Sequence, residues 1–159
     1  MGHPRLPDLH IPSDPALLAY VAGLLDGEGC IRIHSSFEPA TSRSLSHSLR
    51  IGIANTDERL MLWLSDTFGG GLHEKKRRGS RSPNWKPCFD WSLHSHQAEA
   101  FLRSVEPYLV IKKAQAQLAL RFRDLGRHRW KGRTLDPDVV RQRTEMKQHM
   151  HLLNKRGVA

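Results

Sequence analysis

Residues 20–31 have the sequence YVAGLLDGEGCI, and within them the spacing of apolar residues changes from helical to alternating. Upstream, Pro15 follows two residues of the types that cap helices, and proline is tolerated in a first helical turn. The apolar spacing therefore predicts a helix over about residues 15–26, ended by glycine. Glu28 is then placed where this helix ends and a strand begins.

A second face of the same helix carries only small residues. Ala19, Gly23 and Gly27 are spaced four apart, so they fall on one side of the helix. Without bulky side chains, this strip leaves room for a second backbone to approach closely. The two acids at the end of this helix, Asp26 and Glu28, also have an ordinary interpretation. In it, both are solvated side chains beside a glycine turn.

The composition indicates one basic domain. The chain has 159 residues, enough to bury a core, and its 25 lysines and arginines against 16 acids give a net charge of +9. Such a balance favours a polyanionic partner, most commonly nucleic acid. Residues 1–13 lack periodicity, so we expect a mobile N-terminal extension followed by a single domain over 14–159.

The sequence offers no sign of a membrane partner. No apolar run approaches the length of a membrane span, and no basic amphipathic helix, lipidation signal or signal-peptide core is evident. The two cysteines, Cys30 and Cys88, are interpreted as free thiols in a reducing compartment. These features predict a soluble, intracellular protein.

Alternating and helical patterns follow one another along the rest of the chain. Period-two stretches occur around residues 31–37 and 48–53 and again around 72–78 and 88–93, which predicts two antiparallel hairpins. Further helices are expected from Asn55 or Thr56 to Phe68, over Gln97–Val105, from Lys112 or Lys113 to Asp124, and over about Pro137–Lys155. The order αββαββα plus further helices predicts an α+β fold with one four-stranded antiparallel sheet, covered by helices on one face and open on the other.

The open face of this sheet is expected to be polar and basic. A twisted antiparallel ribbon fits the major groove of double-stranded DNA, where alternate side chains reach base edges. For any one residue, the alternative is a solvated strand face. The residues that alternate with the apolar set, and are therefore candidates for DNA contact, are Arg32, His34, Ser36, Ser48, Arg50, His73, Lys75, Arg77, Asp90 and Ser92.

The nine residues 21–29, VAGLLDGEG, resemble the LAGLIDADG signature of homing endonucleases. Val21 takes the place of the first leucine, Gly27 that of the second alanine, and Glu28 that of the final aspartate. The resemblance implies the LAGLIDADG homing-endonuclease fold, in which the four-stranded sheet forms a DNA-binding saddle. It also implies that Glu28 is a catalytic carboxylate.

Two later motifs extend the resemblance to about residues 15–125. In the string IANTD, Asn55 matches the position of the family's active-site glutamine, and Arg59, one helical turn on, matches a basic residue near the scissile phosphates. In the string PYLVIK, Lys112 matches the catalytic lysine of the family's Pro-aromatic-Leu-x-x-Lys. Each residue also has an ordinary role open to it: Asn55 as a helix cap, Arg59 as a solvated helix residue and Lys112 as the start of a helix.

By this resemblance the protein is a single-motif, homodimeric homing endonuclease that cuts a long pseudo-palindromic DNA target and leaves 3′ overhangs. Two protomers would pack their Ala19, Gly23 and Gly27 faces together, so that two Glu28 carboxylates converge at the two-fold axis. Mg²⁺ would bind Glu28, with the Gly27 carbonyl as an additional ligand. Mn²⁺ or Ca²⁺ is expected to occupy the same site, Ca²⁺ without supporting cleavage.

Two other functions use the same fold, an intron RNA maturase and a catalytically inactive DNA-binding regulator. Loss of Glu28 or Lys112 would be expected in the regulator, and both are present. A maturase needs the same basic saddle as a nuclease, so that alternative stays open. The His-x-His pairs at 94–96 and 149–151 lack a third ligand, and zinc is therefore not expected.

Overall fold

The computed structural model describes residues 11–36, 45–75, 86–125 and 136–155. The elements are α1 (Pro15–Glu28), β1 (Gly29–Ser36), β2 (Ser46–Asn55), α2 (Glu58–Phe68), β3 (Gly71–Glu74), β4 (Phe89–His94), α3 (Ser95–Val105), the 3₁₀ turn η1 (Glu106–Tyr108), α4 (Lys113–Leu125) and α5 (Pro137–Leu153). This order confirms the predicted αββαββα arrangement with further helices.

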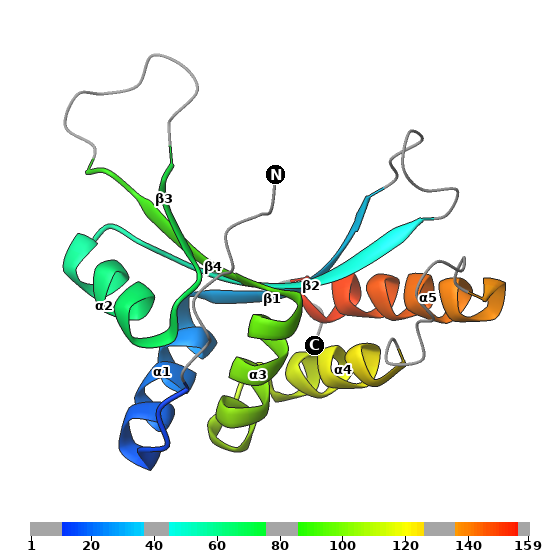
Figure 1. The fold of residues 1–159 in the computed structure, drawn as a ribbon, viewed down its shortest axis with the longest axis horizontal. Helices are drawn as coiled ribbons and strands as arrows, with labels where there is room; N and C mark the ends of the chain where they lie inside the picture. The colour runs from blue at the N-terminus through cyan, green and yellow to red at the C-terminus, as the bar shows by residue number, and fades with distance from the viewer. Residues whose placement is uncertain (1–10, 37–44, 76–85, 126–135, 156–159) are drawn as a thin grey trace, which may run out of the picture.

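The four strands form one antiparallel sheet in the order β1-β2-β4-β3. The two hairpins therefore meet at its centre, where β2 pairs with β4. Figure 1 shows the sheet curving so that the outer parts of both hairpins rise on the side opposite α1, α3 and α4. The predicted saddle, with helices on one face and the other face open, is confirmed.

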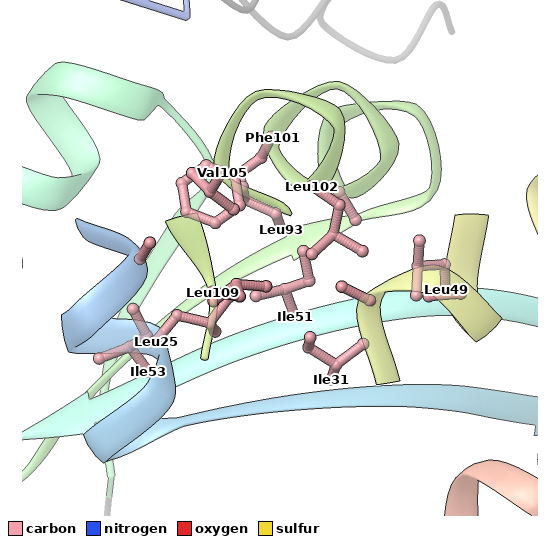
Figure 2. Packing of buried hydrophobic residues seen from close by; sticks show 14 of the residues in the cluster. Leu25, Ile31, Leu49, Ile51, Ile53, Leu93, Phe101, Leu102, Val105 and Leu109 are labelled. Carbon is pink, nitrogen blue, oxygen red and sulfur yellow. The ribbon is translucent and has the colours of Figure 1, made fainter. Parts of the chain in front are cut away.

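The core lies between the sheet and the helices. Alternate strand residues pair across the ladders and are buried together, as Ile31 with Ile51 and Ile51 with Leu93. Figure 2 shows Ile51 and Leu93 on the side of the sheet that faces Phe101 and Leu102 of α3. Burial of one such side chain contributes about 1.5–3 kcal/mol, so the period-two pattern determines which face of the sheet the helices cover.

Helix α1 extends two residues beyond the predicted end. Asp14 caps its first turn by accepting a hydrogen bond from the Ala16 N–H at 2.9 Å. Its last turn is completed by the Gly29 N–H, which donates to the Leu25 carbonyl oxygen. Ahead of the helix, Ile11 packs against the core, so the packed part of the chain begins earlier than residue 14. Residues 1–10 of the expected extension lie outside the described residues.

The expected cap of α2 was wrong. Asp57, not Asn55 or Thr56, caps this helix, and its carboxylate accepts hydrogen bonds from the Arg59 and Leu60 N–H groups. Strand β2 runs on through Asn55, because its pairing with β4 continues to Phe89. This longer strand delays the start of the helix.

Helix α3 begins two residues earlier than expected, at Ser95 directly after β4. Ser95 has a positive φ of 48°, and this conformation turns the chain from strand to helix without a loop. A second tight turn precedes β3, where Gly70 has a φ of +89° and a Cβ would approach the Ser92 carbonyl oxygen to 2.6 Å. Trp91 stabilises that turn by donating its indole N–H to the Gly69 carbonyl oxygen at 2.7 Å.

Candidate active site and nucleic-acid interface

Glu28 is the last residue of α1, and its side chain is exposed where the helix passes directly into β1. Gly29 makes this transition possible. A side chain there would have its Cβ 2.3 Å from Leu25 Cδ1 and 2.7 Å from the Leu25 carbonyl oxygen, which real Cβ atoms do not reach. Glycine thus allows an immediate helix-to-strand junction that holds the Glu28 carboxylate outside the core.

The ladder between β1 and β2 brings Asn55 to the same end of the sheet. Gly29 and Ile53 are the last pair of this ladder, so Glu28, just before Gly29, and Asn55, two residues after Ile53, both lie beyond the same end of it. Asn55 is half-buried, and its Oδ1 accepts a hydrogen bond from the Asp57 N–H at 2.9 Å. The side-chain amide NH₂ is its remaining polar group.

Arg59 lies in the first turn of α2, just beyond Asn55, and its side chain is 92% exposed. Its Nη2 is 3.2 Å from Asp57 Oδ2, and this hydrogen bond is the main reason that the pKa of Asp57 is lowered. An ion pair this exposed contributes little to stability. The guanidinium can therefore turn toward a phosphate at small cost.

Lys112 follows the turn η1 and precedes α4, and its ammonium donates a hydrogen bond to the Asp26 carbonyl oxygen. That carbonyl belongs to the last turn of α1, two residues before Glu28. The structure thus brings three residues that are far apart in the sequence to one end of α1. They are Glu28, Asn55 and Lys112.

The sequence analysis gave Asp26 no functional role and only the alternative of a solvated acid, and that alternative is wrong, because Asp26 is only 9% exposed. Its Oδ2 accepts hydrogen bonds from the N–H groups of Val110 at 2.8 Å and Ile111 at 3.1 Å, and its Oδ1 from that of Lys112 at 2.8 Å. A sequence signal for its burial exists, because Asp26 lies four residues after the buried Ala22 on the apolar side of α1. A carboxylate on that side needs polar partners, which the sequence alone does not identify.

On the open face of the sheet, three basic side chains lie abreast on neighbouring strands. Arg32 of β1 is opposite Arg50 of β2, and Arg50 is opposite His94 of β4. The sequence analysis did not include His94 among the candidates for DNA contact, although it alternates with Asp90 and Ser92, which were included. The row spans three of the four strands.

The remaining candidates have the strand parity that was predicted. His34 lies opposite Ser48 and His73 opposite Asp90, while the alternating core residues face the helices. Lys75 Nζ is 3.5 Å from Asp90 Oδ1, so Asp90 forms an ion pair with Lys75 on the open face. Ser36 and Ser92 have the same parity, and Arg77 lies outside the described residues.

Two histidines of this face are biased toward their neutral forms. The charge of Arg50 lowers the pKa of His34, with burial, Lys147 and Arg32 acting in the same direction. Burial lowers the pKa of His94, and the charges of Arg50 and Arg32 add to this effect, as do those of two histidines. The open face therefore carries a high density of positive charge, and repulsion among these charges favours the neutral forms of the two histidines.

The outer side of α1 is bare. Ala19, Gly23 and Gly27 are all exposed, and a Cβ added at either glycine would have no heavy atom within 4 Å. Large apolar side chains are exposed nearby. They include Tyr20 of the same helix, and Val110 and Ile111 beside Asp26.

In the described parts of the chain, no three histidine, cysteine or acidic side chains gather as metal ligands would. The donors at Glu28 are of the kind that Mg²⁺ prefers, a carboxylate and the backbone carbonyl of Gly27 in the last helical turn. One chain supplies only part of such a site. Among the described helices, none is both long and apolar enough to cross a membrane.

Comparison with solved structures shows which proteins share this fold. The homing endonuclease I-CvuI in complex with the I-CreI DNA target superposes with a TM-score of 0.71 at 20% identity, over 91% of this chain and 85% of that one. The archaeal intron-encoded homing endonuclease I-Vdi141I, complexed with DNA, gives 0.70 at 14% identity, over 89% and 86%. The I-SmaMI LAGLIDADG homing endonuclease bound to cleaved DNA gives 0.66 at 14% identity, over 87% of this chain and 45% of that one.

This chain has the fold of the LAGLIDADG homing endonucleases. The likeness extends over about nine-tenths of the chain. Neither the models of protein families nor the curated proteins match the sequence. The chain therefore shares with these enzymes the shape of the fold and a few short motifs.

Proposed function

We propose that this protein is a site-specific endonuclease of double-stranded DNA that acts as a homodimer on a pseudo-palindromic target. It would hydrolyse phosphodiesters with Mg²⁺ and leave 3′ overhangs. The observation that carries the proposal is the position of Glu28. Its exposed carboxylate lies at the end of α1, where Lys112 binds the carbonyl of Asp26 and where the β1–β2 ladder that leads to Asn55 begins, and the adjoining sheet presents a concave basic face (Figure 1).

The shape and charge of that face support DNA as the substrate. Antiparallel ribbons fit the major groove, and the two hairpins rise to either side of the sheet's centre (Figure 1). Arginines such as Arg32 and Arg50 can donate two hydrogen bonds to a guanine, while Lys75, beyond the end of β3, is placed for phosphates. A net charge of +9 favours association with any such polyanion.

The bare side of α1 supports a second copy of the chain as the partner. Helices pack more closely when their contact faces carry small residues, and Ala19, Gly23 and Gly27 offer such a face. Exposed apolar side chains beside it, 84% for Val110 and 70% for Ile111, would be covered in the same interface. A two-fold pairing would bring a Glu28 from each protomer to the axis, which supplies the second carboxylate that one chain lacks.

The bound metal would be held by Glu28 and by the carbonyl oxygen of Gly27, both hard oxygen donors. When bound, Mg²⁺ would supply neutralisation of charge on the phosphate and on the leaving 3′ oxygen. Lys112 would stabilise negative charge or polarise the attacking water from its place at the end of α1. The Asn55 amide and the Arg59 guanidinium would order solvent and contact the neighbouring phosphates.

Selection from a randomised duplex library tests the proposal directly. With Mg²⁺, the wild-type protein is expected to enrich cut sites of approximate two-fold symmetry, while Glu28→Gln binds the same sites without cutting them. The matched control is Glu145→Gln, the same change at an exposed position of α5, which should cut normally. Sequencing of the cut ends reports the overhang.

Other results of this experiment identify the alternatives. Specific duplex binding without any cutting by the wild-type protein would contradict the nuclease and favour a DNA-binding regulator. In a separate splicing assay, stimulation of RNA splicing that survives Glu28→Gln would favour a maturase.

A further inference from the structure

The segment between η1 and α4 has few means of being held in place. Leu109 at its start is buried, but the next two side chains, Val110 and Ile111, are exposed. Apolar packing therefore does not fix the two residues that lead into Lys112. Their backbone N–H groups and that of Lys112 point instead at the carboxylate of Asp26, whose two oxygens accept all three hydrogen bonds.

We propose that Asp26 is a positioning residue that holds Lys112 beside Glu28, an inference that rests on the proposed nuclease function. Residue 26 contacts Lys112 at both ends of that lysine. The Asp26 carboxylate accepts from the Lys112 backbone N–H, and the Asp26 carbonyl oxygen accepts from the Lys112 ammonium. Because both groups belong to the last turn of α1, the helix that ends in Glu28 also sets the place of the lysine.

The carboxylate is well suited to this role. Its two oxygens have enough lone pairs to accept all three backbone N–H groups, so the buried carboxylate is satisfied by this segment alone. It also lies at the N-terminal end of α4, where the helix dipole favours a negative charge.

A purely structural role is the rival explanation, because the same bonds anchor α4 to α1 across 86 residues of sequence. The two roles differ in whether the effect of losing Asp26 depends on the presence of Lys112. A loss of stability on substitution is expected for either role, but the loss of a mere anchor for α4 would slow cleavage whether or not Lys112 is present. A positioning residue acts through Lys112, so its loss should matter little once that lysine has been removed.

A double-mutant cycle separates these cases. Asp26→Asn keeps the shape of the side chain but replaces one acceptor oxygen with a donor, so the three N–H groups can no longer all be bound. Single-turnover cleavage of the enriched target is expected to slow about 100-fold, as for a catalytic group misplaced by about an ångström, while target affinity changes less than about threefold. Adding Asp26→Asn to Lys112→Met should slow cleavage by less than about threefold beyond Lys112→Met alone.

The cycle has one control variant and two outcomes that would contradict the positioning role. Asp136→Asn makes the same change at the cap of α5, where the carboxylate accepts from the Asp138 N–H, and should cleave normally. Equal cleavage by wild type and Asp26→Asn, or additive losses in the cycle, would overturn the positioning role. A wild type that cuts no sequence would instead overturn the proposed function.

Hydrogen exchange of the backbone amides at residues 110–112 supplies a readout that needs no cleavage. Asp26→Asn should lower their protection selectively, and unchanged protection would overturn the inference even in a protein that does not cut. If Asp26→Asn does not fold, Asp26→Glu provides the same test, because its longer arm keeps the charge and displaces the acceptor oxygens. The same loss of protection and of cleavage rate is then expected.

Discussion

Arg32 and Arg50 lie directly opposite each other on the open face of the sheet. Like charges facing across two strands destabilise a sheet by about 0.2–1 kcal/mol, so this pair weakens the free protein. Such a cost is consistent with a binding face, where a polyanion relieves the repulsion.

We expect Arg32→Gln to stabilise the free protein and weaken its complex. At low salt the free energy of unfolding should rise by about 0.5 kcal/mol, measured by urea denaturation. Target affinity should fall about 10- to 100-fold, as for the loss of one arginine contact to a base. Arg121→Gln on α4, away from the open face, is the control and should change neither quantity. A loss of stability in Arg32→Gln would contradict the repulsion.

DNA affinity should rise as the pH falls from about 7.5 to 5.5. In the free protein the pKa values of His34 and His94 are lowered from 6.5, His34 mainly by Arg50 and His94 mainly by burial. Bound phosphates would favour the charged imidazoliums and raise these pKa values, so binding takes up protons. The expected gain is about threefold to tenfold at constant salt, measured by fluorescence anisotropy.

The double variant His34→Gln, His94→Gln tests the origin of this effect. It should bind with an affinity that varies much less over the same pH range. A pH dependence that persists in full would assign the proton uptake to other groups, of which His73 is the nearest candidate on the face, since it contributes to the lowered pKa of His94.

Acid should remove the stability that Asp26 contributes. The pKa of this residue in the folded protein lies below 3.8, so its contribution is fully present above that value and is lost as the pH falls through the folded pKa. Asp26→Asn should lower the free energy of unfolding by about 3 kcal/mol at pH 7. Urea denaturation at about pH 3 should show a smaller difference between wild type and variant. A difference independent of pH would show that the charge is not what stabilises this contact.

Much of the fold followed from local patterns. Apolar residues such as Ile31 and Ile51 alternate with polar ones, and this alternation determines which face of each strand is buried wherever the strands pair. For the candidate site, the short motifs predicted that Glu28 and Lys112 belong together, and the fold brings both to the last turn of α1, while their catalytic roles stay predictions.

What could not be predicted depends on contacts between distant segments. The cap of α2 moved to Asp57 because pairing with β4 lengthens β2, which no feature of the residues near Asn55 reveals. Asp26 was missed for the same reason, since its partners lie more than 80 residues away. His94 could have been predicted as part of the open face, because it has the same strand parity as Asp90 and Ser92.

The bare side of α1 allows the homodimer to be tested without disturbing the protomer. Gly23 is exposed and a Cβ there meets nothing within 4 Å, so Gly23→Leu should not damage the protomer. Replacing glycine inside a helix should instead raise its stability by about 0.5–1 kcal/mol. A leucine would nevertheless keep a second α1 from approaching. We therefore expect a monomer, with the dimer dissociation constant raised at least about 100-fold, in sedimentation equilibrium.

Gln148→Leu is the control, because it places the same side chain at an exposed position of α5. It should leave the dimer intact, since α5 is not part of the proposed interface. Gly23→Leu should also affect cleavage. Its protomer keeps Glu28 and Lys112 but loses the carboxylate that the partner supplies. It should therefore bind single half-sites and cut neither strand. A dimer that persists in Gly23→Leu would place the two-fold contact elsewhere and would leave the convergence of the two Glu28 carboxylates without support.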